Sequence, residues 1–289
     1  MTTAFVLSGG ASLGAIQVGM LEALYERAVE PDLIVGTSVG AINAAFIASR
    51  EPTVETAQAL GDVWRGVRRS DVFPTSLVTG FVGFVGRTDH LVSERSLRRL
   101  VSRYASIDTL EDARVPLHVI AADLMSGREL RLSRGPALDA VMASAAIPGV
   151  FPPVEWRGHD LIDGGVVNNT PISHALELGA DEVYVLPTGY ACSLEEAPTN
   201  ALGILLQAMN LLIQQRLVIE IDHMSDRVPV VVLPPPCPLE VQPIDFSRAA
   251  MLIERARDDG RAFLDELGGD TAAPGASRHV ERLRPHYHR

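Results

Sequence analysis

Two residues of this chain, Ser38 and Asp163, have surroundings that suit nucleophilic chemistry. Ser38 lies in Gly36-Thr37-Ser38-Val39-Gly40, which fits the pattern G-x-S-x-G at a point where an apolar run changes to helical spacing. The glycines allow a sharp turn that exposes the serine oxygen, and the amides and dipole of the following helix favour negative charge. Taken alone, the same residue types are also ordinary helix caps.

The second feature is a glycine-rich segment, Gly9-Gly10-Ala11-Ser12-Leu13-Gly14, between an apolar run and a helical pattern. Such a loop presents backbone N–H groups to an anion, either a phosphate or the oxyanion of acyl transfer. It is not a P-loop, because no Lys-Ser or Lys-Thr follows Gly14. The G-x-G-x-x-G pattern of a dinucleotide site is not matched either. A purely structural tight turn remains an alternative.

Asp163 is the candidate base for Ser38. A serine hydroxyl is a poor nucleophile at neutral pH, so a neighbouring group must accept its proton. The chain has eight histidines, but none lies in a motif typical of a catalytic base. Asp163 instead ends an apolar run and is followed by Gly164 and Gly165, so its carboxylate can reach a serine at the same end of a sheet. Asp-Gly is also a common turn dipeptide, and the spacing alone leaves a plain turn open.

These segments need a scaffold that brings them to one edge of a sheet. The patterns near the start predict a strand at 4–7, a helix from 16 to about 27, a strand at 32–35 and a helix from 38 onward. This βαβα order predicts a parallel sheet covered by helices. Further strands are predicted at 117–122, 129–132, 160–162, 182–186 and 228–233, and further helices at 53–67, 93–102, 136–144, 171–178, 201–224 and 247–267.

The domain organisation follows from the absence of a repeat or a clear linker. We expect one α/β domain over 1–267, followed by a flexible tail over 268–289 that is rich in Gly, Ala, Pro and charged residues. The three histidines of this tail are too irregularly placed to predict a metal site. No cofactor and no metal are expected, since a calcium site would need an oxygen cluster that the sequence does not offer.

The net charge and the cysteine content limit which partners and which cellular compartment are expected for this protein. The net charge of −11 argues against nucleic acid as a partner, and against simple electrostatic docking on anionic lipid. Cys192 and Cys237 are expected to be reduced thiols of a cytoplasmic protein. Residues 1–10 lack a positive n-region, and the apolar stretch 201–213 is too short to span a bilayer. Any membrane contact should therefore be peripheral.

Together, these motifs resemble the patatin-like phospholipase family. That family has a Gly-rich oxyanion motif at the first strand–helix turn, a G-x-S-x-G elbow after it, and a distant Asp-Gly-Gly or Asp-Gly-Ala. Here they correspond to 9–14, 36–40 and 163–165. The Ala/Ser-rich segment 143–153 and the sequence Asn168-Asn169-Thr170-Pro171 are also similar to the family, and the likeness runs from about Ala4 to Leu186.

The resemblance implies a three-layer α/β/α fold with a mainly parallel sheet, related to cytosolic phospholipase A2. It implies hydrolysis of lipid acyl esters, with Ser38 as nucleophile, Asp163 as base and no catalytic histidine. The amides of Gly9, Gly10 and Ala11 would then form the oxyanion hole. The supporting glycines of these motifs would be Gly14, Gly36, Gly40, Gly164 and Gly165.

Two positions depart from the family pattern. Ala11 replaces the third glycine of the usual Gly-Gly-Gly, and it fits there only if its φ is negative. Leu13 replaces the usual arginine, which removes a positive charge near the site and leaves any preference for anionic head groups open.

Several readings of the substrate and the activity stay open. The apolar stretch 81–86 is either a flap at the mouth of the site or a buried turn, and 201–217 either lines an acyl channel or is an ordinary core helix. A phospholipase A, a lysophospholipase or a carboxylesterase would all fit. The alternatives are an acyltransferase with the same dyad, a catalytically silent lipid-binding protein and a Ser-His-Asp hydrolase.

Overall fold

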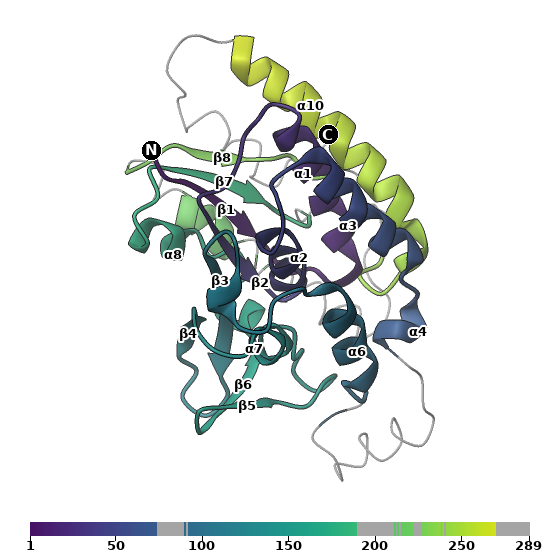
Figure 1. Ribbon diagram of the computed structural model, residues 1–289, viewed down its shortest axis with the longest axis vertical. Coiled ribbons are helices and arrows are strands. Elements are labelled where there is room, and N and C mark those ends of the chain that lie inside the picture. Colours follow the sequence, from purple (N-terminus) through teal and green to yellow (C-terminus); the bar gives the residue numbers. More distant parts are fainter. Residues whose placement is uncertain are drawn as a thin grey trace.

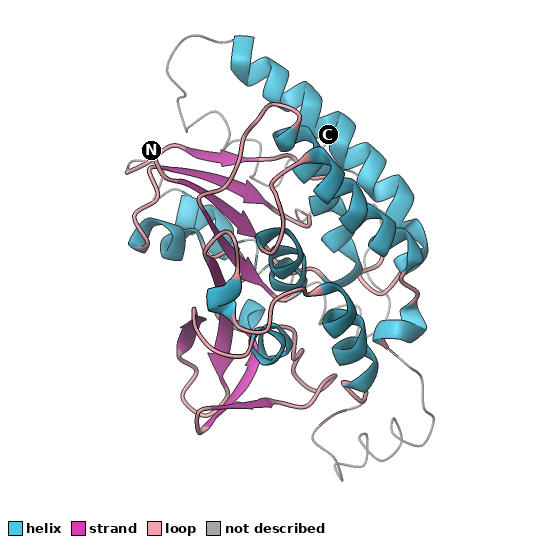
Figure 2. Cartoon of the chain, in the orientation of Figure 1, coloured by secondary structure: helices cyan, strands magenta, loops and turns pink. Residues whose placement is uncertain are grey.

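A central eight-stranded sheet organises the molecule (Figures 1 and 2). The computed structural model describes residues 1–73, 90, 92–189, 211, 213, 215–221, 227–237, 239 and 241–269. The strands are β1 (Thr3–Leu7), β2 (Leu33–Thr37), β3 (Leu117–Asp123), β4 (Glu129–Leu132), β5 (Val154–Trp156), β6 (His159–Asp163), β7 (Glu182–Leu186) and β8 (Val230–Val232). Their order is β5-β6-β3-β2-β1-β7-β8, with β4 pairing to β3.

The sheet is mainly parallel. Strands β3, β2, β1, β7 and β8 run parallel to one another, whereas β4 and β6 are antiparallel to β3, and β5 is antiparallel to β6. The parallel strands are continuous apolar runs rather than alternating ones, because helices bury both faces of this part of the sheet.

Helices lie on the two faces of the sheet and complete the three-layer α/β/α fold that the sequence predicts (Figure 1). They are α1 (Ala15–Tyr25), α2 (Val39–Ala48), α3 (Val54–Gly66), α4 (Arg69–Val72), α6 (Arg95–Tyr104), α7 (Ala137–Ser144), α8 (Ile172–Glu177) and α10 (Ala249–Gly269). The larger apolar core joins α1, α2, α3, α7 and α10 to one face. A smaller core joins α8 and the helical residues 215–221 to the other.

Each predicted strand overlaps an observed strand, and the βαβα start is confirmed. Two short elements were not predicted: β5 follows a pair of prolines, and α4 has no apolar period of its own. Of the predicted helix 201–224, only 211, 213 and 215–221 are described, and these are helical. The stretch 81–86, for which both a flap and a buried turn were left open, and the tail beyond Gly269 lie outside the described residues. The single domain over 1–267 stays a prediction.

One expectation about the cysteines is wrong. Cys237 is exposed and disulfide-bonded. The cysteines of the chain have no motif spacing, so the sequence does not reveal a disulfide. In the part of the chain that the structure describes, no helix combines the length and the apolar character that crossing a membrane requires.

A close helix pair, α1 and α10, closes the outer layer (Figure 1). A Cβ atom on Gly19 would lie 2.2 Å from the carbonyl oxygen of Ile253 and 2.5 Å from the amide nitrogen of Arg257. These neighbours are backbone atoms, so they cannot move aside as a flexible side chain would. Glycine at position 19 therefore sets the distance between the two helix axes.

We predict that Gly19→Ala lowers the free energy of unfolding by about 1–3 kcal/mol, because the added methyl group forces α10 away from α1. The matched control is Gly61→Ala in the interior of α3. There the added Cβ would meet only the side chains of Val18 and Arg65, each 3.3 Å away. Alanine is also the better helix former, so this variant should change stability by less than about 1 kcal/mol. Equal losses in urea unfolding of both variants would contradict the interpretation.

Candidate active site

Ser38 occupies a strained turn between β2 and α2. Its φ is 55° and its ψ is −125°, a combination that costs a non-glycine residue about 1–3 kcal/mol. Glycines on either side make room for the turn. A Cβ on Gly36 would lie 2.7 Å from the carbonyl oxygen of Gly40, and a Cβ on Gly40 would lie 2.2 Å from that of Leu7. The elbow that G-x-S-x-G predicts is therefore present, with Ser38 almost fully buried.

Strand register brings Asp163 to Ser38. Thr37 at the end of β2 pairs with Ile120 of β3, and the next residue of β3, Ala121, pairs on its other side with Asp163 at the end of β6. Ser38 and Asp163 thus flank the same point of β3, and their side chains meet across it. The Ser38 hydroxyl donates a hydrogen bond of 2.6 Å to Oδ2 of Asp163.

The Asp163 carboxylate is held by its own turn. Its Oδ1 accepts a hydrogen bond of 2.7 Å from the amide of Gly165, and its own amide donates to the carbonyl of Ala146. A Cβ on Gly164 would lie 2.3 Å from the carbonyl oxygen of Ile120, which explains why glycine follows the aspartate. Burial raises the pKa of Asp163 to about 6, although the hydrogen bonds from Ser38 and Gly165 oppose that rise.

Ser144, at the end of α7, is a site residue that the sequence reasoning did not single out. Its hydroxyl accepts a hydrogen bond of 2.8 Å from the amide of Ser38 and donates one of 2.6 Å to the carbonyl of Ile120. The side chain is fully buried, and it ties the strained elbow to β3. The only signal in the sequence is the Ala/Ser-rich segment that contains it.

The glycine-rich loop after β1 is held through its carbonyl groups. The Ser8 carbonyl accepts a hydrogen bond from Nε2 of Gln17, and the Gly9 carbonyl accepts bonds from the side chains of Thr188 and Asn169. Because a trans peptide is planar, the amide of Gly10 must point away from the tethered Gly9 carbonyl. Among the described residues, neither the Gly10 amide nor the Ala11 amide donates a hydrogen bond.

The three expected oxyanion donors differ in their surroundings. Gly9 is close to Ser38, since a Cβ on Gly9 would lie 2.9 Å from the Cβ of Ser38, but the Gly9 amide donates to the carbonyl of Asn169 at 3.3 Å. Ala11 has a φ of 51°, so the condition of a negative φ is not met and the alanine is strained. Gly10 and Ala11 therefore have unengaged amides, whereas Gly9 does not.

The described histidines near the sheet have partners elsewhere. His118 contacts Ser133, His159 contacts Asp123, and His174 contacts Glu129. The hydrogen bonds to the Asp163 carboxylate come from Ser38 and Gly165. The described residues contain no group of three His, Cys, Asp or Glu side chains that could hold a metal ion.

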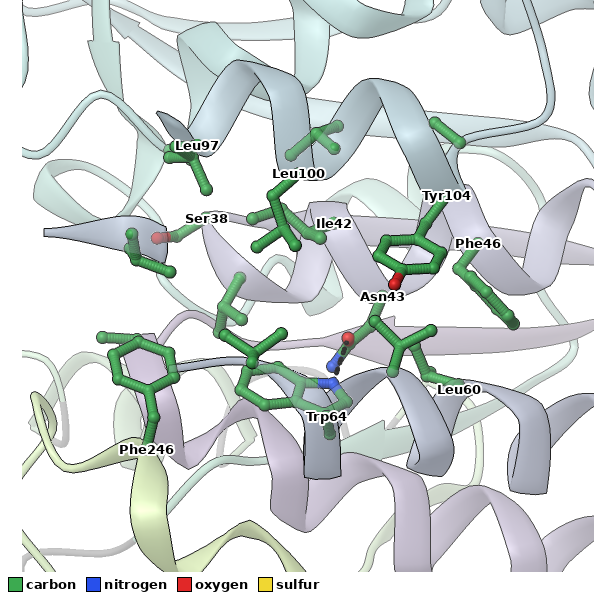
Figure 3. A pocket seen from close by; sticks show the side chains of 18 of the residues that line it. Ser38, Ile42, Asn43, Phe46, Leu60, Trp64, Leu97, Leu100, Tyr104 and Phe246 are labelled. Carbon is green, nitrogen blue, oxygen red and sulfur yellow. Dashed lines mark hydrogen bonds between the residues drawn. The ribbon is translucent and has the colours of Figure 1, made fainter. Parts of the chain in front are cut away.

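An apolar cavity begins at Ser38 (Figure 3). It passes between α2, α3 and α6, and Ala11 from the glycine-rich loop also lines it. Gly14 supports this wall from behind, because a Cβ there would lie 2.5 Å from Val39 and 2.8 Å from Trp64. The arrangement places a hydrogen-bonded serine, a buried carboxylate and two unengaged amides at the end of an apolar cavity. Such a site suits acyl transfer from an apolar ester.

A family model and several known proteins are similar to this chain. Residues 5–176 match the family model described as "Patatin-like phospholipase". Lysophospholipase nte1 of Aspergillus terreus is 29% identical over 191 residues, which cover 64% of this chain and 12% of that protein. Patatin-like phospholipase domain-containing protein 6 of Mus musculus is 27% identical over 190 residues, covering 65% of this chain and 14% of that protein.

The chain therefore spans only a small part of the length of these relatives. Among solved structures, human GIVD cytosolic phospholipase A2 is similar with a TM-score of 0.46 and 13% sequence identity, over 97% of this chain and 59% of that one.

We predict that the reactivity of Ser38 depends on pH with a midpoint of about 6, rather than near the ordinary aspartate value of about 4. Below the midpoint Asp163 is protonated and cannot accept the serine proton, so the rate should fall about tenfold for each further pH unit. The measurement is the rate of Ser38 labelling by a fluorophosphonate between pH 4 and 9. A midpoint near 4 would show that the carboxylate is not perturbed.

The raised pKa of Asp163 also predicts how the free energy of unfolding depends on pH, which gives an independent check of that pKa. The folded protein binds an extra proton between about pH 4 and pH 6, so this group makes the fold less stable as the pH rises through that window. In Asp163→Asn this contribution should be absent, and the variant should gain stability relative to the wild type above pH 6.

We also predict that Ser144→Ala lowers the free energy of unfolding by about 1–3 kcal/mol and slows the labelling of Ser38. The change leaves the Ser38 amide and the Ile120 carbonyl buried without their partner. The control is Ser102→Ala, at an exposed serine that donates only to a carbonyl of its own helix, with an expected change within about 0.5 kcal/mol. Unchanged labelling in Ser144→Ala would mean that this bond does not position the elbow.

Proposed function

The chain belongs to the patatin-like phospholipase family, and from that membership we propose that it is a lipid acyl hydrolase with a Ser38–Asp163 catalytic dyad. Phospholipase A, lysophospholipase and carboxylesterase activities all fall within this proposal. The observation that carries it is the 2.6 Å hydrogen bond from the Ser38 hydroxyl to the buried Asp163 carboxylate, at the end of an apolar cavity. A structural serine would not need a strained turn, a raised carboxylate pKa and an empty apolar space at its oxygen.

In the first step, Asp163 accepts the proton of Ser38 while the serine oxygen attacks the ester carbonyl carbon. The negative charge that develops on the carbonyl oxygen is stabilised by the amides of Gly10 and Ala11, and this differs from the expectation that Gly9 also donates. Donors of this kind typically contribute about 2.7–4 kcal/mol each to the stability of the transition state. Asp163 then delivers its proton to the leaving alcohol, and an acyl-serine remains.

In the second step, Asp163 accepts a proton from water, and the resulting hydroxide attacks the acyl-serine carbonyl. The carboxylic acid that leaves takes the acyl chain, and the proton on Asp163 returns to Ser38. A base works best when its pKa lies near the working pH. The rise of the Asp163 pKa to about 6 therefore supports a role that an ordinary aspartate would fill poorly.

The lipid substrate also makes peripheral membrane contact part of the proposal. Leu124 and Met125 in the turn between β3 and β4 are 47% and 84% exposed, and Val166 after the Asp163 turn is 55% exposed. Large apolar side chains exposed on elements next to the site suit contact with a lipid surface. This contact would be apolar, since the net charge of the chain is −11.

We predict that Ser38→Ala and Asp163→Asn each reduce the hydrolysis of p-nitrophenyl esters by about a thousandfold or more, because each removes one of two groups that act as a unit. The measurement compares kcat/KM of the folded variants with that of the wild type. A fluorophosphonate should label the wild type at Ser38 and leave Ser38→Ala unlabelled.

Two controls keep the test specific. Ser12→Ala removes a buried hydroxyl of the glycine-rich loop that bonds only to the Gln242 carbonyl, and it should change the rate by less than tenfold. His118→Ala, His159→Ala and His174→Ala should each retain activity. If one of them instead abolished it, the dyad would be wrong and a Ser-His-Asp hydrolase would take its place.

A further inference from the structure

The apolar cavity is a channel with a direction. Ser38, Ile42 and Phe46 lie at i, i+4 and i+8 along α2, and all three line the cavity. Figure 3 shows Ser38 at one end, Phe46 at the other and Ile42 between them. Helix α6 contributes Leu97, Leu100, Val101 and Tyr104 to one side, and helix α3 with the residue that follows it contributes Leu60, Val63, Trp64 and Val67 to the other. Both sets have the i, i+3, i+4, i+7 spacing of a single helix face.

The length of the channel follows from the rise of helix α2 between Ser38 and Phe46. Phe46 lies eight positions after Ser38 along α2, which corresponds to a rise of about 12 Å at about 1.5 Å per residue. A zigzag hydrocarbon chain, with C–C bonds of about 1.5 Å and angles of about 111°, advances about 1.25 Å per carbon. The Phe46 side chain also leans towards the start of its helix, which shortens the free path. The channel therefore accommodates about eight to ten carbons.

The Phe46 side chain at the far end of the channel is held in place by Arg50. The guanidinium of Arg50 lies over the Phe46 ring, with its central carbon 3.8 Å from the ring centroid. The same guanidinium donates to the carbonyl oxygens of Phe46 and of Tyr104, at 2.7 Å and 3.3 Å, and to the hydroxyl of Ser106 at 2.8 Å. Arg50 thus joins the end of α2 to the end of α6 behind the Phe46 ring.

The side wall is braced as well. The indole N–H of Trp64 donates a hydrogen bond of 3.0 Å to Oδ1 of Asn43, and the amide of Asn43 donates to Oε1 of Gln17 and to the Gly14 carbonyl. Gln17 in turn holds the Ser8 carbonyl at the start of the glycine-rich loop. A wall fixed in this way cannot widen easily to admit a longer or branched chain.

We propose that this channel is a ruler for the acyl chain, and that Phe46 is its end stop. The inference rests on the proposed hydrolase function and adds the substrate class, which is esters of straight medium-length acyl chains of about eight to ten carbons. The acyl carbonyl lies at Ser38, the chain follows α2 past Ile42, and its methyl end meets the Phe46 ring. Chains longer than this have no further apolar space to fill.

The test is kcat/KM for p-nitrophenyl esters of straight acyl chains from two to sixteen carbons. Each carbon that enters the channel should raise kcat/KM by up to about fourfold, which is the transfer free energy of one buried methylene group. The rise should stop at about eight to ten carbons and be followed by a plateau or a fall. A steady rise to sixteen carbons, or no dependence on length, would overturn the ruler.

Two variants should change, in opposite directions, the chain length at which kcat/KM stops rising, which we call the break. Phe46→Ala removes the end stop and should shift the break to longer chains, with Phe46→Leu as a milder version if the alanine variant does not fold. Ile42→Phe blocks the channel about 6 Å from Ser38 and should shift the break to about four or five carbons. The control is Phe246→Ala, which removes the same ring from the wall near Ser38 (Figure 3) and should leave the break in place.

Fluorophosphonate labelling distinguishes a failure of the proposed hydrolase function from a failure of the acyl ruler alone. If the wild type is not labelled at Ser38 and hydrolyses no ester, the proposed function fails. If Ser38 is labelled and short esters are hydrolysed, but Phe46→Ala and Ile42→Phe leave the break where it is, the ruler alone fails. The ruler also fails if Phe246→Ala shifts the break as far as Phe46→Ala does.

Discussion

The site depends on how closely the first turn of α2 approaches the ends of β1 and β2. A side chain at Gly40 would overlap the Leu7 carbonyl, and one at Gly36 would overlap the backbone of α2 itself. Because both positions are glycine, the chain can turn back within a few residues, and Ser38 is left in a backbone conformation that it would not adopt alone. The packing of the helix on the strand ends offsets the strain, and the hydroxyl is held where β3 and β6 can present Asp163.

The other parts of the site are tied to this elbow by one polar network. Gln17 bonds to the carbonyls of Ser8 and Leu186 at the ends of β1 and β7, and it accepts a bond from Asn43 of α2. Asn43 in turn accepts the indole N–H of Trp64. All of these polar atoms are buried and paired, so the network orients the glycine-rich loop and the channel wall together. A change in the wall is therefore expected to shift the amides of Gly10 and Ala11, the proposed oxyanion donors.

Local sequence patterns determine the fold class of this protein and the places of its candidate site residues in the fold. The apolar runs and helical spacings around Ser38 predict the parallel sheet, since a strand, a tight glycine turn and a helix have few other ways to bury their apolar faces. The positions of Ser38 and Asp163 at strand ends follow from the same patterns, because an apolar run ends at or just before each residue and glycines lie close after it. Family resemblance over 4–186 adds the pairing of the two, which spacing alone does not supply.

What the sequence alone could not determine depends on contacts between distant segments. The bond between Ser144 and the Ser38 amide, the raised pKa of Asp163 and the engaged amide of Gly9 all follow from strand register and burial, which no local pattern encodes. The apolar channel is of the same kind. The sequence left open whether 81–86 and 201–217 line an acyl site, and it did not single out the channel that lies between α2, α3 and α6. Each of these helices has an ordinary apolar face, and only their packing decides that part of those faces encloses a space rather than a filled core.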